Sequence, residues 1–429
     1  MRQLTCTYLE LCSLAGASTL VTTVQPVPDR TFDDLPWYRW WVLQQVRSQH
    51  QHLFLSLPNL DFDNDTNLHR FFIVWDQIRE LIQASEPKTI ESITNALQAL
   101  GAIFTQNHYD AAQSAKDLVF SVLGWQTMLY KPDFVTDSMA GYRILNEMDG
   151  YRGETRLCLS QSALAGNKTL PNFLLGFGIM LPPPNYSAFD DADDKTVFRE
   201  FKTVSPREMN AYVLAKICCM RFQWVDSLPC HLEMDKHSGT LFLYRYPSFC
   251  VSNLQQHMSK NKKQNQKCIL HCCAFDRRSS VPWADEEAVT GLLQEVLLSY
   301  RLLFGQTKRS RSLFQNLRPF ARIPPEGQDQ LLSQLCSRKR PYCSITLTER
   351  DEYDLADDFP HLRSKLARLS SYASGKKPRS LRQLWVDKRN SPAWLAFWSV
   401  LIFGSVGILL AFIQTVFQIL EYVDAVKHG

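Results

Sequence analysis

The closing stretch of the chain constrains its fold more than any other part of the sequence. Residues 391–420 carry no charged side chain, and Ala393–Ile413 form a run of 21 apolar or small residues. About 20 such residues let a helix cross the hydrocarbon core of a membrane, and a helix satisfies its own backbone hydrogen bonds there. The sequence therefore predicts one transmembrane helix over residues 391–420, followed by a short tail over residues 421–429.

The residues around this helix predict its orientation. Tryptophan rings favour the headgroup level of a membrane, and the cytosolic flank of a transmembrane helix carries an excess of Lys and Arg. The residues expected at the membrane interface are Lys376, Lys377, Arg379, Arg382, Trp385, Lys388, Arg389, Trp394 and Trp398. Because the tail holds one Lys against two acids, we expect a cytosolic body and a lumenal C-terminus. This arrangement is that of a tail-anchored protein, which we expect in the endoplasmic reticulum rather than in the mitochondrial outer membrane.

One face of the predicted transmembrane helix carries small and amide side chains. Gly407, Ala411, Gln414 and Gln418 recur at spacings of three and four residues, with Thr415 beside them. Small residues let two helices approach closely, and amides can hydrogen-bond between helices in a membrane. The pattern favours self-association or pairing with another membrane protein. Small residues scattered without a partner are the alternative interpretation.

The positive charge of the chain is concentrated just before the predicted helix. The formal net charge is +4, whereas residues 361–389 alone hold nine Lys or Arg and one Asp. Residues 1–360 are therefore mildly acidic, and such a body lacks the basic surface that nucleic-acid binding requires. We expect no nucleic-acid partner. The basic juxtamembrane segment, residues 376–390, instead predicts contact with anionic lipids of the cytosolic membrane face.

Hydrophobic periodicity predicts an α+β body over residues 34–375, after a lead-in segment over residues 1–33. Residues 34–148 are expected to be helical, and residues 149–375 to be mixed with a small antiparallel β element. The predicted helices are Trp37–Val46, Leu68–Ile82, Ile90–Phe104, Ala111–Leu129, Ser205–Ile217 and Asp285–Phe304, and the predicted strands are Arg156–Ser160, Arg221–Val225, His231–Met234 and Thr240–Tyr244. The last two strands are expected to form a hairpin across residues 235–239.

A leucine stripe precedes the basic segment. Leu362, Leu366 and Leu369 recur at helical spacing, with Arg363 and Lys365 beside them. This pattern suits a helix that lies on an anionic membrane surface. An ordinary surface helix is the alternative.

Two acidic clusters resemble metal sites but depart from them. Asp190–Asp194 has the spacing of an Asp-Asp-x-x-Asp magnesium site, yet it follows Pro182–Pro184 in an expected loop. Asp61–Asp65 begins like a calcium loop, but Thr66 stands where the turn requires Gly, and Phe72 where it requires Glu. Neither cluster therefore predicts a bound metal.

Cys268, His271, Cys272 and Cys273 are possible soft metal ligands. In an expected strand their side chains alternate between two faces, which predicts buried thiols instead of a metal site. No Walker loop, dinucleotide fingerprint, nucleophile elbow, zincin helix or kinase signature occurs. We accordingly expect no cofactor and no metal, and we assign no catalytic residue.

The N-terminus bears on the compartment of the body. Glu10 interrupts the first apolar run, which favours a short helix over a cleaved signal peptide. A signal peptide would place the body in the lumen, where the sequons at Asn64, Asn167 and Asn185 would be accessible. A lumenal glycoprotein is thus the alternative topology.

Several stretches of the chain carry a family resemblance. They are LPWYRWWVLQQ (35–45), GWQTMLYKPDF (124–134), WVDSLPCHLEMDKHSGTLFLYRYPSFC (224–250), LLSYRLLFGQTKRSR (297–311) and PRSLRQLWVDKRNSPAWLAFWSV (378–400). In these stretches, and over nearly its whole length, the chain resembles a group of uncharacterised proteins of filamentous ascomycete fungi that end in one membrane span. The resemblance implies the same architecture of body plus anchor and implies no activity.

Two functions are compatible with this sequence. The first is a membrane-anchored body that binds another protein or organises a membrane site. The second is a membrane-associated enzyme that acts on an apolar metabolite through dispersed residues. A deep pocket with converging polar groups of perturbed pKa would favour the enzyme, and its absence would favour the binding protein.

Overall fold

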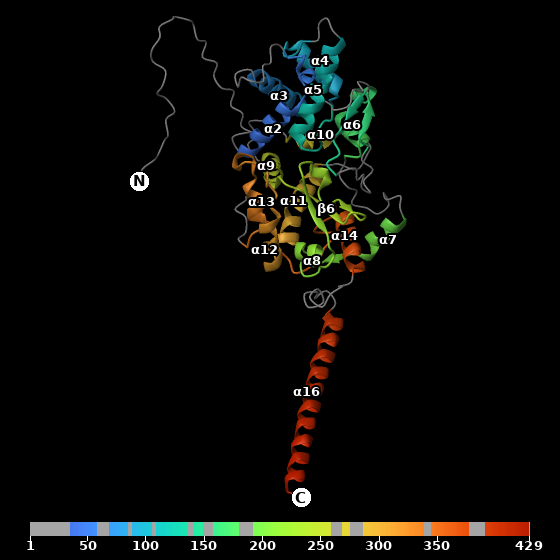
Figure 1. Cartoon of the computed structure of the whole chain (residues 1–429). Coiled ribbons are helices and arrows are strands. Elements are labelled where there is room, and N and C mark those ends of the chain that lie inside the picture. The colour runs from blue at the N-terminus through green and yellow to red at the C-terminus, as the bar shows by residue number, and fades with distance from the viewer. Residues whose placement is uncertain are drawn as a thin grey trace, which may run out of the picture.

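The structure, a computed structural model, consists of an α+β body and one long C-terminal helix, α16 (Ser391–His428) (Figure 1). It describes residues 35–57, 68–84, 88–104, 109–134, 141–148, 158–179, 192–258, 268–274, 286–338, 345–376 and 391–428. Helices make up most of the described body, and short strand pairs complete it. The predicted fold class, a mainly helical α+β body followed by one apolar helix, is confirmed. The lead-in segment lies outside the described residues.

The first part of the body is helical, as the periodicity predicts. Its helices are α2 (Pro36–Ser48), η1 (Gln51–Phe54), α3 (Leu68–Gln83), α4 (Ile90–Ala99) and α5 (Tyr109–Thr127). α4 ends before the expected Phe104 because Gly101 adopts a φ of +68°. The chain closes the helix there, and the Ala102 N–H donates to the Leu97 carbonyl across 3.0 Å.

Three small sheets contribute the β structure of the described residues. β1 (Gly141–Arg143) pairs with β2 (Ser160–Ser162), and β3 (Thr203–Val204) pairs with β7 (Tyr353–Asp354), both antiparallel. In the third sheet β6 (Thr240–Tyr244) lies between β4 (Arg221–Val225) and β5 (Met234–Asp235). β5 and β6 form the expected antiparallel hairpin, whereas β4 and β6 run parallel, which the sequence analysis did not predict.

Two of the predicted strands differ in their bounds. The expected strand His231–Met234 is wrong except at its end, because η4 (Leu228–Cys230) occupies the preceding turn and Leu232 has a φ of +60°. A left-handed residue cannot continue a β ladder. The expected strand Arg156–Ser160 lies partly outside the described residues, and β2 begins at its last residue.

Further helices follow in the second part of the body. They are η2 (Ala163–Asn167), α6 (Leu170–Gly176), α7 (Ala192–Glu200), α8 (Ala211–Lys216), α9 (Pro247–Met258), α10 (Ile269–Ala274), α11 (Glu286–Tyr300), the π-helix η5 (Arg301–Gly305), α12 (Lys308–Leu317), η6 (Pro325–Gly327), α13 (Gln330–Leu335) and α14 (Arg363–Gly375). The predicted helix Ser205–Ile217 begins only at Ala211, because the Asn210 carbonyl oxygen Oδ1 accepts from the Val213 N–H across 3.1 Å and caps it there. The predicted helix Asp285–Phe304 corresponds to α11 and η5.

Two expectations about local structure are wrong. The segment Ile269–Ala274 is the helix α10, not a strand, because its apolar residues face the core at helical spacing. The thiol prediction nevertheless holds, since Cys268 and Cys273 are buried and unpaired. The acidic cluster is also not entirely a loop, because α7 begins at Ala192.

The leucine stripe lies in the core of the body and not on a membrane surface. Leu362, Leu366 and Leu369 are each at most 1% exposed, and they belong to the main hydrophobic cluster. The stripe forms a face of α14, which packs against α7. The leucine spacing correctly predicted which face of the helix is apolar. That face packs against the rest of the body, not against lipid.

Candidate functional site

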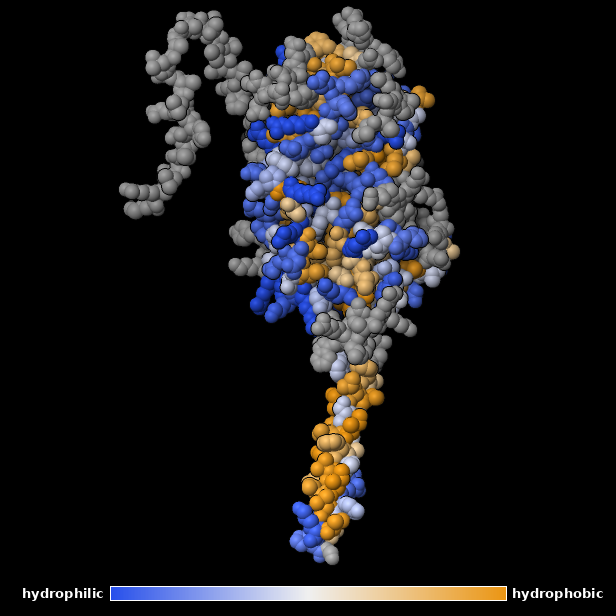
Figure 2. Space-filling view, viewed as in Figure 1, coloured by the Kyte–Doolittle hydropathy of each residue, from blue (hydrophilic) through white to orange (hydrophobic). Residues whose placement is uncertain are grey.

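α16 is the described helix that is long and apolar enough to cross a membrane. The candidate span covers 35 residues, Trp394–His428, and its most apolar part has no residue buried against the body. Figure 2 shows apolar side chains along most of this helix, in contrast to the mixed surface of the body. At a rise of 1.5 Å per residue, α16 is about 57 Å long, which exceeds the ~30 Å hydrocarbon core. α16 continues through residues 421–428, where the sequence predicted only a short tail.

The structure places three of the nine predicted interface residues. Lys376 Nζ lies 4.7 Å from the centroid of the Tyr372 ring at the end of α14. The rings of Trp394 and Trp398 lie 6.1 Å apart on the first turns of α16. The other six predicted interface residues lie outside the described residues: Lys377, Arg379, Arg382, Trp385, Lys388 and Arg389.

The predicted packing face of α16 is open. Gly407, Ala411, Gln414 and Gln418 are all exposed, and a Cβ added to Gly407 would meet no atom within 4 Å. The body therefore leaves this face free for another helix. Pairing through it stays a prediction.

A group of partly buried charges lies where the parallel strands β4 and β6 end. Asp226 follows β4 and Arg245 follows β6, so the parallel pairing brings them together, with 2.8 Å between Arg245 Nε and Asp226 Oδ1. Lys131 Nζ lies 2.5 Å from Asp226 Oδ2 and 2.8 Å from Glu147 Oε1. The Trp41 indole N–H, from α2, donates to Asp226 Oδ2 across 3.1 Å. The group thus joins the helical part of the body to the sheet.

These charges are balanced by one another. Burial opposes ionisation of Asp226, but Lys131 and Arg245 outweigh it and hold the pKa of this carboxyl below its ordinary value. Burial would also lower the pKa of Lys131, yet the carboxylates of Glu147 and Asp226 raise it. Both groups stay charged near neutral pH, and their charged atoms pair with one another and with Arg245 and Glu147. We assign this group to the architecture of the body.

His231 and Ser299 resemble a base and a nucleophile but are not arranged as such. His231 Nε2 lies 2.8 Å from Ser299 Oγ, and His231 Nδ1 accepts from the Tyr244 backbone N–H. The ring proton of the neutral imidazole therefore sits on Nε2 and is donated to Ser299, whose own hydroxyl donates to the Val296 carbonyl. Burial and the charge of Lys365 lower the pKa of His231. The ring cannot take a proton from Ser299, and both side chains are buried.

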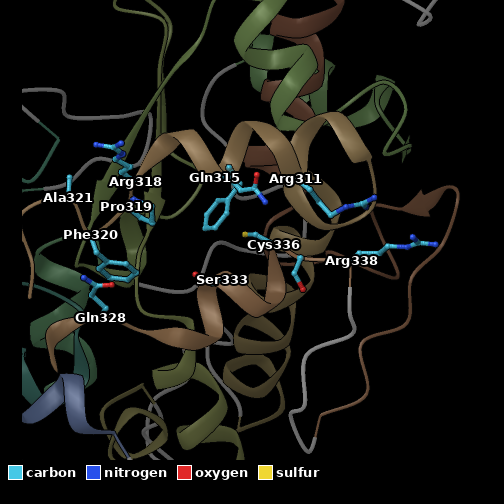
Figure 3. A pocket seen from close by; sticks show the side chains of 12 residues that line it. Arg311, Gln315, Arg318, Pro319, Phe320, Ala321, Gln328, Ser333, Cys336 and Arg338 are labelled. Carbon is cyan, nitrogen blue, oxygen red and sulfur yellow. The ribbon is translucent and has the colours of Figure 1, made fainter. Parts of the chain in front are cut away.

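An open pocket lies between α12 and α13 (Figure 3). Its cavity volume is about 690 Å³, and its lining includes Arg311, Arg318 and Arg338 but no acidic residue. Apolar side chains of Phe314, Pro319, Phe320 and Ala321 also line it. The pocket was not predicted from the sequence, although Arg311, at the end of the basic run Lys308–Arg311, lines it.

The side chains of the pocket divide it into two ends. Figure 3 shows Arg311 and Arg338 extending toward one end, Arg318 and Phe320 at the other, and Cys336 between the two helices. Cys336 is the one lining residue other than the arginines that titrates, and burial raises the pKa of its thiol well above the ordinary value. The thiol stays protonated, and the described lining residues include no group suited to act as a general acid or base.

The described residues form no metal site. No group of three His, Cys, Asp or Glu side chains in them could hold a metal ion. His271 and the thiols beside it are occupied otherwise, since His271 Nε2 lies 3.1 Å from Thr290 Oγ1 and the Cys268 thiol donates to Asn253 Oδ1 across 2.6 Å. Asp61–Asp65, Asp190 and Asp191 lie outside the described residues.

Comparisons with protein-family models, with curated proteins and with solved structures give no match for this chain. Function is therefore inferred from three features of the molecule: the apolar helix α16, the exposed surface of the body, and the arginine-lined pocket.

Proposed function

We propose that this chain is a single-pass membrane protein whose body lies in the cytosol and binds a protein partner at the membrane. The observation that carries the proposal is α16, a helix of 38 residues whose apolar side chains are exposed almost throughout. An apolar surface of this size is unfavourable in water and is expected to be covered by lipid or by another protein. The basic flank before it favours the cytosol for the body.

The cysteines of the body agree with a reducing compartment. None of the nine cysteines that the structure describes forms a disulfide, and six of the nine are buried. Disulfides are typical of proteins that fold in the secretory lumen. Thiols throughout a body of this size therefore support the cytosolic assignment.

An exposed apolar patch supports the binding role. Leu55, Leu100 and Phe104 are 53%, 61% and 54% exposed, and the Phe104 N–H donates to the Ser56 carbonyl across 2.9 Å. The patch lies beside α4, at the end of the body far from α16 (Figure 1). Large exposed apolar side chains that gather in one place are typical of protein interaction sites. A partner bound there would be tethered to the membrane through the body and α16.

Glycosylation mapping in microsomes tests the topology. A sequon added after Gly429 is expected to receive a glycan, while the exposed native sequon at Asn167 is expected to remain unmodified. The variant Asn167→Gln controls for the native sequon. A glycan on Asn167, or protection of the body from added protease, would overturn the cytosolic assignment.

Charged substitutions test the binding surface. In chains purified from membranes, Leu100→Glu with Phe104→Glu is expected to remove a specific co-purifying protein. Met258→Glu, which alters an exposed apolar residue on α9, is the matched control and should retain that protein. Equal retention by both variants would contradict a partner at this patch.

A further inference from the structure

We infer that the pocket between α12 and α13 binds a phosphate group between Arg311 and Arg338, with an apolar part of the same ligand lying toward Phe320. This site goes beyond the proposed function, because it belongs to the body and does not depend on which side of the membrane the body occupies. Two sources could supply such a ligand: the headgroup of a phospholipid, or a soluble organic phosphate. The chemistry that the pocket recognises is the same in both.

Charge gives the first argument. Three guanidinium groups line the pocket without an acid to balance them, so the cavity carries a net positive charge. Arginine presents planar donors that fit two oxygens of a phosphate at once, and these charge-assisted bonds are stronger than neutral ones. An anion bound there would relieve the repulsion between the arginines.

The free donors of Arg338 give the second argument. Arg311 uses one nitrogen, Nη1, to donate to the Gly305 carbonyl across 2.6 Å, which fixes the side chain at the wall of the pocket. Arg338 is exposed and has no hydrogen-bond or ionic partner within the described part of the chain. One arginine is therefore held in place and the other is available to close on a ligand. Figure 3 shows the two extending toward the same end of the pocket.

Size gives the third argument. A cavity of about 690 Å³ lies within the ~300–1,000 Å³ range of small-molecule sites. An inorganic phosphate would fill only a fraction of this space and would leave Pro319 and Phe320 exposed to solvent. A ligand that combines a phosphate with an apolar part fills both ends.

The position of the pocket favours a lipid. Figure 1 shows α12 near the end of the body from which the chain continues toward α16. Residues 377–390 connect the end of α14 to α16, and 14 residues span at most ~50 Å. A connection of this length lets α12 reach the lipid headgroups. The basic segment 376–390 attracts anionic lipids without a defined pocket, so the two contributions must be separated by experiment.

A binding experiment with matched variants separates them. The full chain in neutral detergent micelles is titrated with dioctanoyl phosphatidic acid or with glycerol 3-phosphate, and bound ligand is counted by native mass spectrometry. Arg311→Gln with Arg338→Gln is expected to weaken binding at least about tenfold, as expected for lost bonds to a charged group. The control, Lys308→Gln with Arg322→Gln, removes the same charge from neighbouring positions outside the pocket lining and is expected to change binding less than about twofold.

Two further measurements complete the test. If Arg311→Gln lowers the unfolding temperature through its lost bond to Gly305, Arg338→Gln alone carries the comparison. Tighter binding of dioctanoyl phosphatidic acid than of glycerol 3-phosphate supports a lipid ligand, and equal binding supports a soluble phosphate in the same site. Equal losses in the pocket and control variants, or no saturable binding of either probe, would overturn the inference.

Discussion

The ammonium of Lys365 lies 3.1 Å from the carboxylate of Glu233, and the side chains of this pair are only 5% and 3% exposed. The same ammonium donates to the carbonyls of Pro229 and His231 across 2.7 and 2.8 Å. Lys365 belongs to α14, the last helix before the segment that leads to α16, and Glu233 precedes β5. A buried ion pair thus fixes α14 to the segment that leads into the sheet.

Breaking this pair is expected to destabilise the body strongly. Lys365→Met leaves the Glu233 carboxylate buried without its cation, which lowers the free energy of unfolding by about 3–5 kcal/mol. Adding Glu233→Gln removes the unpaired charge and should restore part of the loss. Urea unfolding of the full chain in detergent, followed by tryptophan fluorescence, measures both. Equal stability of the single and double variants would contradict a coupled pair.

A second buried carboxylate makes stability depend on pH. Glu295, on α11, accepts the backbone N–H groups of His361 and Leu362 at the start of α14, with a shortest distance of 2.7 Å to Leu362. Burial raises the pKa of Glu295 from 4.5 to about 8, although these donors oppose the rise. Between these values the unfolded chain is ionised while the folded chain holds the proton. The free energy of unfolding therefore falls as pH rises through this window.

The variant Glu295→Gln isolates this effect. The Gln amide keeps an acceptor for the two N–H groups and does not titrate. Relative to Glu295→Gln, the wild-type chain is expected to lose stability on the order of 2 kcal/mol between pH 6 and pH 8. Groups that titrate in both proteins cancel in this difference. Parallel pH profiles for the two proteins would show that Glu295 has no raised pKa.

The π-helix η5 depends on a glycine. A Cβ at Gly305 would lie 2.6 Å from Arg301 Cζ. That guanidinium cannot move away, because Arg301 Nε donates to Glu349 Oε1 across 2.7 Å and Nη1 donates to the Leu335 carbonyl across 2.5 Å. Gly305→Ala is expected to cost about 2 kcal/mol of stability or more. Gly375→Ala, where no atom lies within 4 Å, is the control and should be neutral or stabilising by up to about 1 kcal/mol.

The helices and strands of this fold are easier to predict from the sequence than the elements against which they pack or pair. Long periodic segments such as α3 and α5 follow from local spacing alone, because one face of each must be buried. The parallel pairing of β4 with β6 does not follow from local spacing. The residues of each strand predict that strand but do not predict which strand lies next to it. The leucine stripe of α14 shows the same limit. Its spacing correctly predicted a helix with an apolar face, but that face packs in the core of the body and not on a membrane surface.

The candidate sites depend on contacts between segments that are far apart in the sequence, so the sequence did not reveal them. Asp226 and Arg245 each stand directly after a strand, but they meet only because β4 and β6 are parallel neighbours. Arg311 and Arg338 come from segments separated by α13, so the pocket exists only in the folded chain. The apolar helix is the exception. Its signal is carried by one uninterrupted segment, and no tertiary contact is needed to recognise it.

The open face of α16 provides the last prediction. A bulky residue at Gly407 would prevent another helix from approaching this face, so Gly407→Ile is expected to reduce dimer formation in lipid bilayers by several-fold. Ser405→Ile is the matched control, because position 405 lies about 200° around the helix from position 407 and also replaces a small side chain. Crosslinking in lipid vesicles at a high lipid-to-protein ratio measures the dimer fraction. A dimer fraction that falls equally in both variants would indicate a general effect of bulk on insertion, and an unchanged fraction would show that α16 does not pair through this face.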